Sequence, residues 1–309
     1  HKALYLAGRM ANEAIHVADM NRALEARFVP TDEQDKFEPI TNLQEAFEGL
    51  FESSVKTPQT VVIDDFPSLV EAVPQFPIHL RDLLDTYKET SQLNIILMAN
   101  GLEQLDGRII GDRSLIGPYV SEYFEVKPFS LVDMKSLGLH YAKDDLRTVF
   151  AVTGGLPAYV QYFDNGESID TNIINLFFSV SGALFEETQN ILHRDMKNIT
   201  GANAILSGLA TLERPYYVEL LQASQIKSGT FTSRLNDLMA MGLVGRIQAN
   251  SRGPAKYADY HFTNSMFHFW YRYVYKYWGD IVRGNGADVY QTYVKPQLKD
   301  FVEASCIAM

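Results

Sequence analysis

Two unbroken apolar runs set the strongest limit on what this chain can fold into. Thr60–Ile63 is rich in β-branched residues, and Leu93–Ala99 is a second run that follows a helical pattern at His79–Glu89. A shorter run, Ala3–Ala7, precedes a helical pattern at Asn12–Ala26. Strands without polar alternation are buried on both faces, and strands separated by helices form parallel sheets. The sequence therefore predicts an α/β fold whose parallel sheet has helices on both faces.

The pattern changes character after Pro128. Before this residue, Thr41–Phe51 has the apolar spacing of an amphipathic helix, and Tyr123–Lys127 is predicted as a further strand. The chain has 309 residues, more than one hydrophobic core usually serves, so we expect a second domain. We place the boundary near Phe129.

The part that follows Phe129 is mainly helical. Helical patterns lie at Leu131–Tyr141, Leu146–Val152, Ala158–Phe163, Ile173–Phe178, Ala183–Met196, Ala202–Leu212, Tyr216–Ala223 and Thr230–Met241. Two predicted strands come next, Gly242–Ile247 and Tyr257–Phe262, with a loop that contains Gly and Pro between them. Three helices followed by two strands is the order of a winged helix-turn-helix.

Composition excludes several classes of protein. The chain is 46% hydrophobic and 21% charged, which excludes a disordered or fibrous protein, and no run approaches the roughly 20 apolar residues of a membrane helix. A net charge of −11 argues against a surface that binds nucleic acid throughout. Cys306 is the single cysteine, so an internal disulfide or a cysteine metal cluster is excluded. We expect a soluble, cytoplasmic protein with no membrane partner.

The most informative motif is a pair of acids directly after the first β-branched run. Asp64 and Asp65 would lie at the carboxyl edge of the sheet, where open α/β folds bind ligands. In P-loop ATPases this is the Walker B position, where one acid holds Mg²⁺ and the next orients the attacking water. Asn100 follows the neighbouring strand, where a polar side chain would position water beside a γ-phosphate. A helix cap and an Asn-Gly turn explain the same residues without any chemistry.

Two further segments are distinctive. In Gly154-Gly155-Leu156-Pro157 the glycines allow close backbone approach and the proline starts the next helix, although a plain loop explains them equally well. Phe267–Trp278 is dense in aromatic residues. Because these rings recur at every helical angle, we predict a core segment rather than a base-stacking surface.

Together these segments resemble the archaeal-type ATPases, a STAND- and AAA-related family of P-loop ATPases with a C-terminal winged helix. The resemblance covers nearly the whole chain, with the pieces in family order. The pieces are the Walker B strand Val61–Phe66, the sensor strand Leu93–Gly101, the strand exit Pro128-Phe129, Gly154–Pro157, a winged helix from about Ala202 to Thr263, and the signature Phe269–Val274.

The resemblance implies an ATPase core at 1–129, a helical lid at 130–200, a winged helix with an aromatic-rich helix at 201–288, and the start of a C-terminal extension at 289–309. It also implies ATP and Mg²⁺ as cofactors. Asp64 would be the Mg²⁺ carboxylate, Asp65 the water-orienting acid and Asn100 the sensor. Gly155 and Pro157 of the lid would approach the nucleotide.

The chain departs from the family in three places. The family usually has Asp-Glu at Asp64-Asp65, so the second acid here is one methylene shorter, and Gly117-Pro118 stands where members commonly carry Gly-Arg. The phosphate-binding P-loop motif needs a Gly-Lys dipeptide, and these 309 residues contain none. We therefore expect that the printed sequence begins after the P-loop helix and does not hydrolyse ATP by itself. Because the missing strand is central in the family, its neighbours would have exposed edges.

A local reversal of charge suggests a nucleic-acid partner. Residues 225–256 contain five basic residues and one acid, which is typical of a phosphate-contacting surface. The candidate DNA contacts are Lys227, Thr232, Arg234, Arg252 and Lys256. Two function classes remain open: an ATP-driven molecular switch that acts on double-stranded DNA or a protein partner, and a non-catalytic winged-helix protein for DNA binding or interaction.

Overall fold

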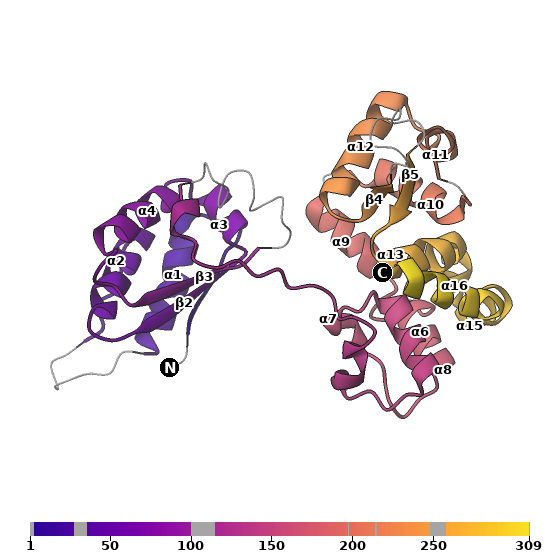
Figure 1. Ribbon diagram of the computed structural model, residues 1–309, viewed down its shortest axis with the longest axis horizontal. Coiled ribbons are helices and arrows are strands. Elements are labelled where there is room, and N and C mark those ends of the chain that lie inside the picture. The colour runs from indigo at the N-terminus through magenta and orange to yellow at the C-terminus, as the bar shows by residue number, and fades with distance from the viewer. Residues whose placement is uncertain are drawn as a thin grey trace. The chain divides into compact units, whose positions relative to one another are not determined.

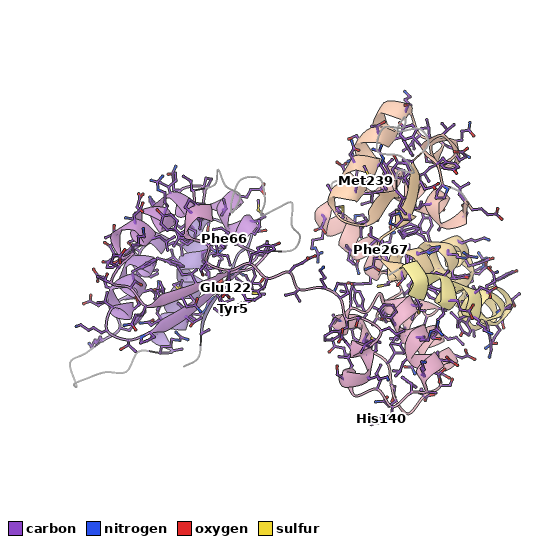
Figure 2. The ribbon with its side chains drawn as sticks, viewed as in Figure 1. Tyr5, Phe66, Glu122, His140, Met239 and Phe267 are labelled. Atoms are coloured by element: carbon purple, nitrogen blue, oxygen red, sulfur yellow. The ribbon has the colours of Figure 1, made fainter. Side chains whose placement is uncertain are left out.

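The computed structural model describes residues 3–27, 36–99, 115–196, 198–213, 215–247 and 258–308. The chain divides into His1–Phe124 and Glu125–Met309, which we call unit 1 and unit 2. Each unit has its own hydrophobic core, and the two cores share no residue. Phe66 of unit 1 and Phe267 of unit 2, labelled in Figure 2, are both almost fully buried.

Unit 1 contains a parallel three-stranded sheet in the order β1-β2-β3. The strands are β1 (Leu4–Ala7), β2 (Gln59–Asp64) and β3 (Leu93–Leu97). In the parallel register Val61 pairs with Leu4 on one side and with Ile95 on the other. These strands coincide with the three apolar runs, so the predicted α/β class with a parallel sheet is confirmed.

The helices of unit 1 pack against one face of this sheet (Figure 1). They are α1 (Glu13–Glu25), α2 (Leu43–Ser54), α3 (Phe66–Ala72) and α4 (Phe76–Thr86). Val61 and Ile63 face these helices and are fully buried, whereas Tyr5 and Ile96 on the opposite face are 54% and 43% exposed. The described residues thus show helices on one face, where the sequence predicted them on both. Asn94, which is polar and exposed, lies on the open face.

The strand predicted at Tyr123–Lys127 is not formed. Residues 120–130 have no regular secondary structure, and Phe124 and Val126 are 78% and 95% exposed. The apolar residues of this segment suggested a strand, but a strand also needs a neighbour whose backbone groups pair with its own. No strand of the described residues pairs with it, so this prediction was wrong.

Unit 2 begins with short helices that lead to three helices and a hairpin. Its first elements are η2 (Asp133–Leu137), α6 (Lys143–Thr153), α7 (Pro157–Val160), α8 (Ile169–Phe177), α9 (Glu187–Asp195), α10 (Thr200–Thr211), α11 (Tyr217–Ser224), α12 (Ser228–Ala240), β4 (Val244–Ile247) and β5 (Asp259–Phe262). β4 and β5 are antiparallel and lie beside α10, α11 and α12 (Figure 1). The helix predicted at Leu131–Tyr141 shrinks to the 3-10 turn η2, because Gly138 takes a left-handed conformation with φ 72° and ends it.

The C-terminal part of unit 2 is a series of short α, 3-10 and π segments that ends in a longer helix. These are α13 (Ser265–Phe269), η4 (Trp270–Val274), η5 (Tyr275–Tyr277), α14 (Trp278–Asp280), η6 (Ile281–Asn285), α15 (Gly286–Val289), η7 (Tyr290–Val294) and α16 (Lys295–Ala308). Trp270 and Tyr271 are at most 1% exposed, and the Trp270 indole donates to the Phe185 carbonyl at 2.7 Å. The aromatic segment is therefore core, as predicted. Within the described ranges, no helix combines the length and apolar character needed to span a membrane.

Candidate functional site

Asp64 and Asp65 lie where the three strands of unit 1 end. Asp64 is the last residue of β2 and pairs in register with Ala7, the last residue of β1. The Gly8 amide donates to the Asp64 carbonyl at 2.7 Å. On the other side, the Phe66 amide donates to the carbonyl of Met98, which follows β3, at 2.9 Å. The two acids are thus held between the exits of both neighbouring strands, at the carboxyl edge of the sheet.

The backbone at Asp65 is in a conformation that costs free energy. Its φ is 46°, in the left-handed region that residues other than glycine seldom adopt. Asp65 precedes α3 without capping a backbone amide, and its Oδ2 accepts from the Ser68 hydroxyl at 2.8 Å. A Cβ atom on Gly8 would lie 2.2 Å from the Asp65 carbonyl oxygen, so glycine is needed there. Strained backbone of this kind concentrates at functional sites. A plain helix cap does not explain the strain at Asp65.

The Asp64 carboxylate has a partner from a neighbouring strand. Its Oδ1 accepts from the Asp65 amide at 2.9 Å, and its Oδ2 accepts from the Tyr5 hydroxyl. This hydrogen bond to the carboxylate raises the pKa of Tyr5, so the phenol stays protonated as a donor. Sequence reasoning missed Tyr5. No local pattern marks it, because Tyr5 shares a face of the sheet with Asp64 only through the register in which Tyr5 pairs with Val62.

The oxygen ligands that the two acids offer fit Mg²⁺. Carboxylate oxygens are the hard ligands that this ion prefers, and each Asp64 oxygen accepts one hydrogen bond, which leaves a lone pair free. The residues that the structure describes contain no group of three or more His, Cys, Asp or Glu side chains able to enclose a metal. Proteins usually hold Mg²⁺ by one or two carboxylates, with water and substrate phosphate completing its shell. Asp64 and Asp65 fit that mode and not an all-protein cage.

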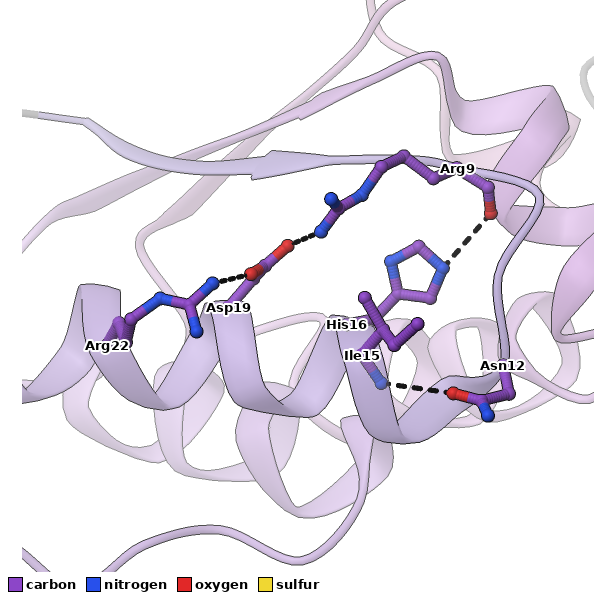
Figure 3. A network of polar contacts seen from close by, with 6 residues as sticks. All are labelled: Arg9, Asn12, Ile15, His16, Asp19 and Arg22. Atoms are coloured by element: carbon purple, nitrogen blue, oxygen red, sulfur yellow. Dashed lines mark hydrogen bonds and ion pairs between the residues drawn. The ribbon is translucent and has the colours of Figure 1, made fainter.

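A polar network ties the chain that follows β1 to α1 (Figure 3). Asp19 forms ion pairs with Arg9 and with Arg22. The buried His16 ring lies beside them, and its Nε2 donates to the Arg9 carbonyl at 3.1 Å. These contacts hold the turn that starts at Gly8, and Gly8 in turn holds the backbone of the two acids.

Gly155 and Pro157 lie at the join between α6 and α7 in unit 2. Gly154 and Gly155 end α6 with φ values of 66° and 70°. The Phe129 amide donates to the Gly155 carbonyl at 2.9 Å, and Pro157 is the first residue of α7. The glycines thus fasten the entry of the chain into unit 2. The approach of Gly155 and Pro157 to a nucleotide stays a prediction.

The candidate DNA contacts of the described residues lie on or next to α12. Lys227 precedes the helix and is exposed. The Thr232 hydroxyl donates to the Ser228 carbonyl at 3.0 Å, and Arg234 forms an ion pair with Asp237 at 2.8 Å. The charge of Arg234 is therefore partly neutralised within its own helix. Three predicted residues, Asn100, Arg252 and Lys256, lie outside the described residues.

No protein-family model and no curated protein matches the chain by sequence. Among solved structures, a Walker-type ATPase of Pyrococcus abyssi matches 88% of this chain and 84% of its own, with a TM-score of 0.57 and 14% identity. Cdc6p from Pyrobaculum aerophilum matches 92% of this chain and 80% of its own, with a TM-score of 0.33 and 12% identity. The Aeropyrum pernix Orc1 protein, solved in complex with DNA, matches 92% of this chain and 79% of its own, with a TM-score of 0.33 and 10% identity. The two lower scores do not establish a shared arrangement of the whole chain.

The first of these structures carries the conclusion about the fold, because it matches most of both chains. The identity is too low to transfer an activity or a residue's role. The chain has the fold of an archaeal Walker-type ATPase, the fold that its resemblance to the archaeal-type ATPases predicts.

Proposed function

We propose that the protein is an ATP-binding and ATP-hydrolysing molecular switch of the archaeal-type ATPase family. One observation carries this proposal. Two acids follow the central strand of a parallel sheet, and the second is held in a strained conformation by the exits of both neighbouring strands. In a Walker-type ATPase fold, this is the place where Mg²⁺ and the attacking water are held.

Each residue of the site has a distinct part in this proposal. Asp64 would hold Mg²⁺, and the Tyr5 hydroxyl orients its carboxylate. Asp65 orients the attacking water, which its shorter side chain reaches from a fixed left-handed backbone. Asn100 senses the γ-phosphate. When bound, Mg-ATP supplies the phosphoryl group that is transferred to water.

The same proposal covers the rest of the chain. Residues 130–200 form the lid, with Gly155 and Pro157 near the nucleotide, 201–288 form the winged-helix part, and 289–309 begin an extension. No Gly-Lys dipeptide occurs in these 309 residues, so they contain no phosphate cradle of the P-loop pattern. We place the switch in the cytoplasm, in agreement with its single cysteine.

Mg²⁺-dependent ATP hydrolysis by the full-length gene product tests this function. We expect Asp64→Asn and Asp65→Asn each to lower turnover about a hundredfold, because each removes a charge from the Mg²⁺ and water end of the site. Glu71→Gln is the control, since Glu71 is an exposed acid on the adjoining helix α3. Turnover unchanged in both Asp variants, or no thermal shift of the wild-type protein with Mg-ATP, would contradict the proposal.

A second candidate function is binding of double-stranded DNA through a winged helix. It is supported by the order α10, α11, α12, β4 and β5, in which α11 and α12 are packed through Tyr217 and Phe231 at a ring distance of 5.0 Å. α12 would be the recognition helix, with Lys227 and Thr232 at its exposed beginning.

Electrophoretic mobility at low and moderate salt tests this second function. We expect Lys227→Ala and Arg252→Ala to weaken binding more than Arg234→Ala, because Arg234 is already paired with Asp237. Lys299→Ala on α16 is the control, an exposed cation far from α12 in the sequence. Equal affinity in all four proteins would exclude this surface.

A further inference from the structure

Unit 2 contains an open cavity of about 1200 Å³, large enough for a small-molecule ligand. Its wall is formed by the end of α10, by β5 and the residues after it, and by the C-terminal segments from α13 to α16. Asp64 and Asp65 belong to unit 1, and neither Gly155 nor Pro157 lines the cavity. The lining residues all belong to unit 2, and Gly154, the neighbour of Gly155, is one of them.

The charged side chains of the cavity wall are mostly positive. Arg272 and Lys276 line it, as does Lys127, which forms an ion pair with Glu125. Glu213 is the one acid among its lining residues in the described part of the chain. This is the opposite of the whole chain, whose net charge is −11. His268 also lines the cavity and is neutral at pH 7, because burial and the nearby Arg272 lower its pKa to about 4. The charge pattern favours an anionic ligand.

Two buried polar atoms in this wall have no hydrogen-bond partner among the described residues, the Ser265 hydroxyl and Nδ1 of His261. Ser265 is only 7% exposed. The hydroxyl of Tyr273, a residue that is 2% exposed, is hydrogen-bonded to Arg272. Native proteins seldom leave buried polar groups unpaired, and these two add polar character to the wall of the cavity.

The remaining wall is aromatic and is shaped by irregular helices. Tyr277 and Tyr293 are stacked with ring centres 4.5 Å apart, and Phe262 is stacked on His268 at 5.1 Å. Tyr273 lies in the π-helix η4 and Tyr293 in the π-helix η7. Such π segments are rare and recur at functional sites, because the wider turn redirects side chains. Flat rings at the wall suit a ligand with a planar part.

We propose that this cavity binds a small anion of the carboxylate or phosphate class that also carries an aromatic ring. Arg272 and Lys276 hold the anionic group at the opening. The tyrosine rings cover its planar part. The proposal requires neither ATP nor the acids of unit 1.

A pair of fluorescent probes distinguishes the contribution of the ligand's charge to binding from that of its aromatic ring. 8-Anilinonaphthalene-1-sulfonate is an anionic aromatic molecule, and N-phenyl-1-naphthylamine has the same rings without the sulfonate. In the full chain, we expect the double variant Arg272→Gln and Lys276→Gln to weaken binding of the sulfonate about tenfold and to leave the neutral probe unchanged. Lys299→Gln is the control, an exposed cation of α16 that does not line the cavity. An equal effect on both probes, or none on either, would overturn the anionic assignment.

A blocking variant tests whether the cavity itself is the site. Ala304 lines the cavity and is exposed, so Ala304→Trp places a large ring inside the cavity without disturbing the core. We expect it to abolish binding of both probes, whereas Glu303→Trp, one residue earlier on the exposed side of α16, leaves binding intact. Both variants should melt at the wild-type temperature. Wild-type affinity in Ala304→Trp would show that the probes bind elsewhere and would refute the proposal.

Discussion

Two features require glycine at position 155, a left-handed backbone and a close contact, whereas Gly138 has only the first of them. The φ of Gly155 is 70°, and a Cβ atom there would lie 2.3 Å from the Phe129 carbonyl oxygen. Gly138 has a similar φ of 72° but no heavy atom near the added Cβ. We expect Gly138→Ala to cost about 1–2 kcal/mol for the left-handed backbone alone, and Gly155→Ala roughly 3 kcal/mol or more. Urea unfolding of both variants measures the difference, and equal losses would contradict the close contact.

His268 makes the stability of unit 2 depend on pH. Burial, with a smaller effect of Arg272, lowers its pKa from 6.5 to about 4. Between these values the unfolded chain binds a proton that the folded chain does not, so stability falls as the pH drops from 6.5 towards 4. The loss amounts to about 3 kcal/mol. We expect His268→Phe, which keeps the stack on Phe262, to lose less stability between pH 7 and 4.5 than the wild type in urea unfolding; equal losses would contradict this.

At the scale of single residues, the sequence predicted only part of the candidate site. Asp64 and Asp65 were found because an acid pair directly after a buried strand is a local pattern in the sequence. Tyr5 and Gly8 were missed, although they contact these acids. Tyr5 is 59 positions from Asp64, and only the register of β1 against β2 brings the two side chains together.

Among the elements, the short helices at the end of unit 2 depend on one close contact. A Cβ atom on Gly286, in α15, would lie 1.7 Å from the Phe178 carbonyl oxygen. Gly279, in α14, has nothing closer than the Arg283 guanidinium at 3.5 Å. We expect Gly286→Ala to destabilise the protein by about 3 kcal/mol or more, and Gly279→Ala to stabilise it by up to about 1 kcal/mol. Thermal unfolding of the two variants should move in opposite directions; a shift of the same sign would count against this packing.

Most elements were predictable because their apolar period is a local property. The three strands and the helices α1, α2, α4 and α6 lie within a few residues of their predicted positions. Tyr123–Lys127 failed because pairing depends on a neighbouring strand, and no described strand lies beside it. The π-helices η4, η6 and η7 were not foreseen either, since the packing of their side chains and not their residue types sets the wider turn.

On the scale of the whole molecule, the two separate cores predict two unfolding steps. Phe47 is fully buried in the core of unit 1, and Phe269 is fully buried in that of unit 2. We expect Phe47→Ala and Phe269→Ala each to cost about 3–5 kcal/mol and to lower only the transition of its own unit. Differential scanning calorimetry checks this, and a single transition that both variants shift equally would show that the units unfold together.

The sequence by itself determined the α/β class, the positions of most helices and strands, the aromatic core and the acid pair after β2. These properties depend on residue type and period over a few neighbours. Only the tertiary structure decided that Tyr5 meets Asp64, that a single face of the sheet carries the described helices, and that cationic and aromatic side chains converge in one cavity of unit 2. Each of these depends on groups far apart in the chain, and their meeting depends on register and packing that no local pattern encodes.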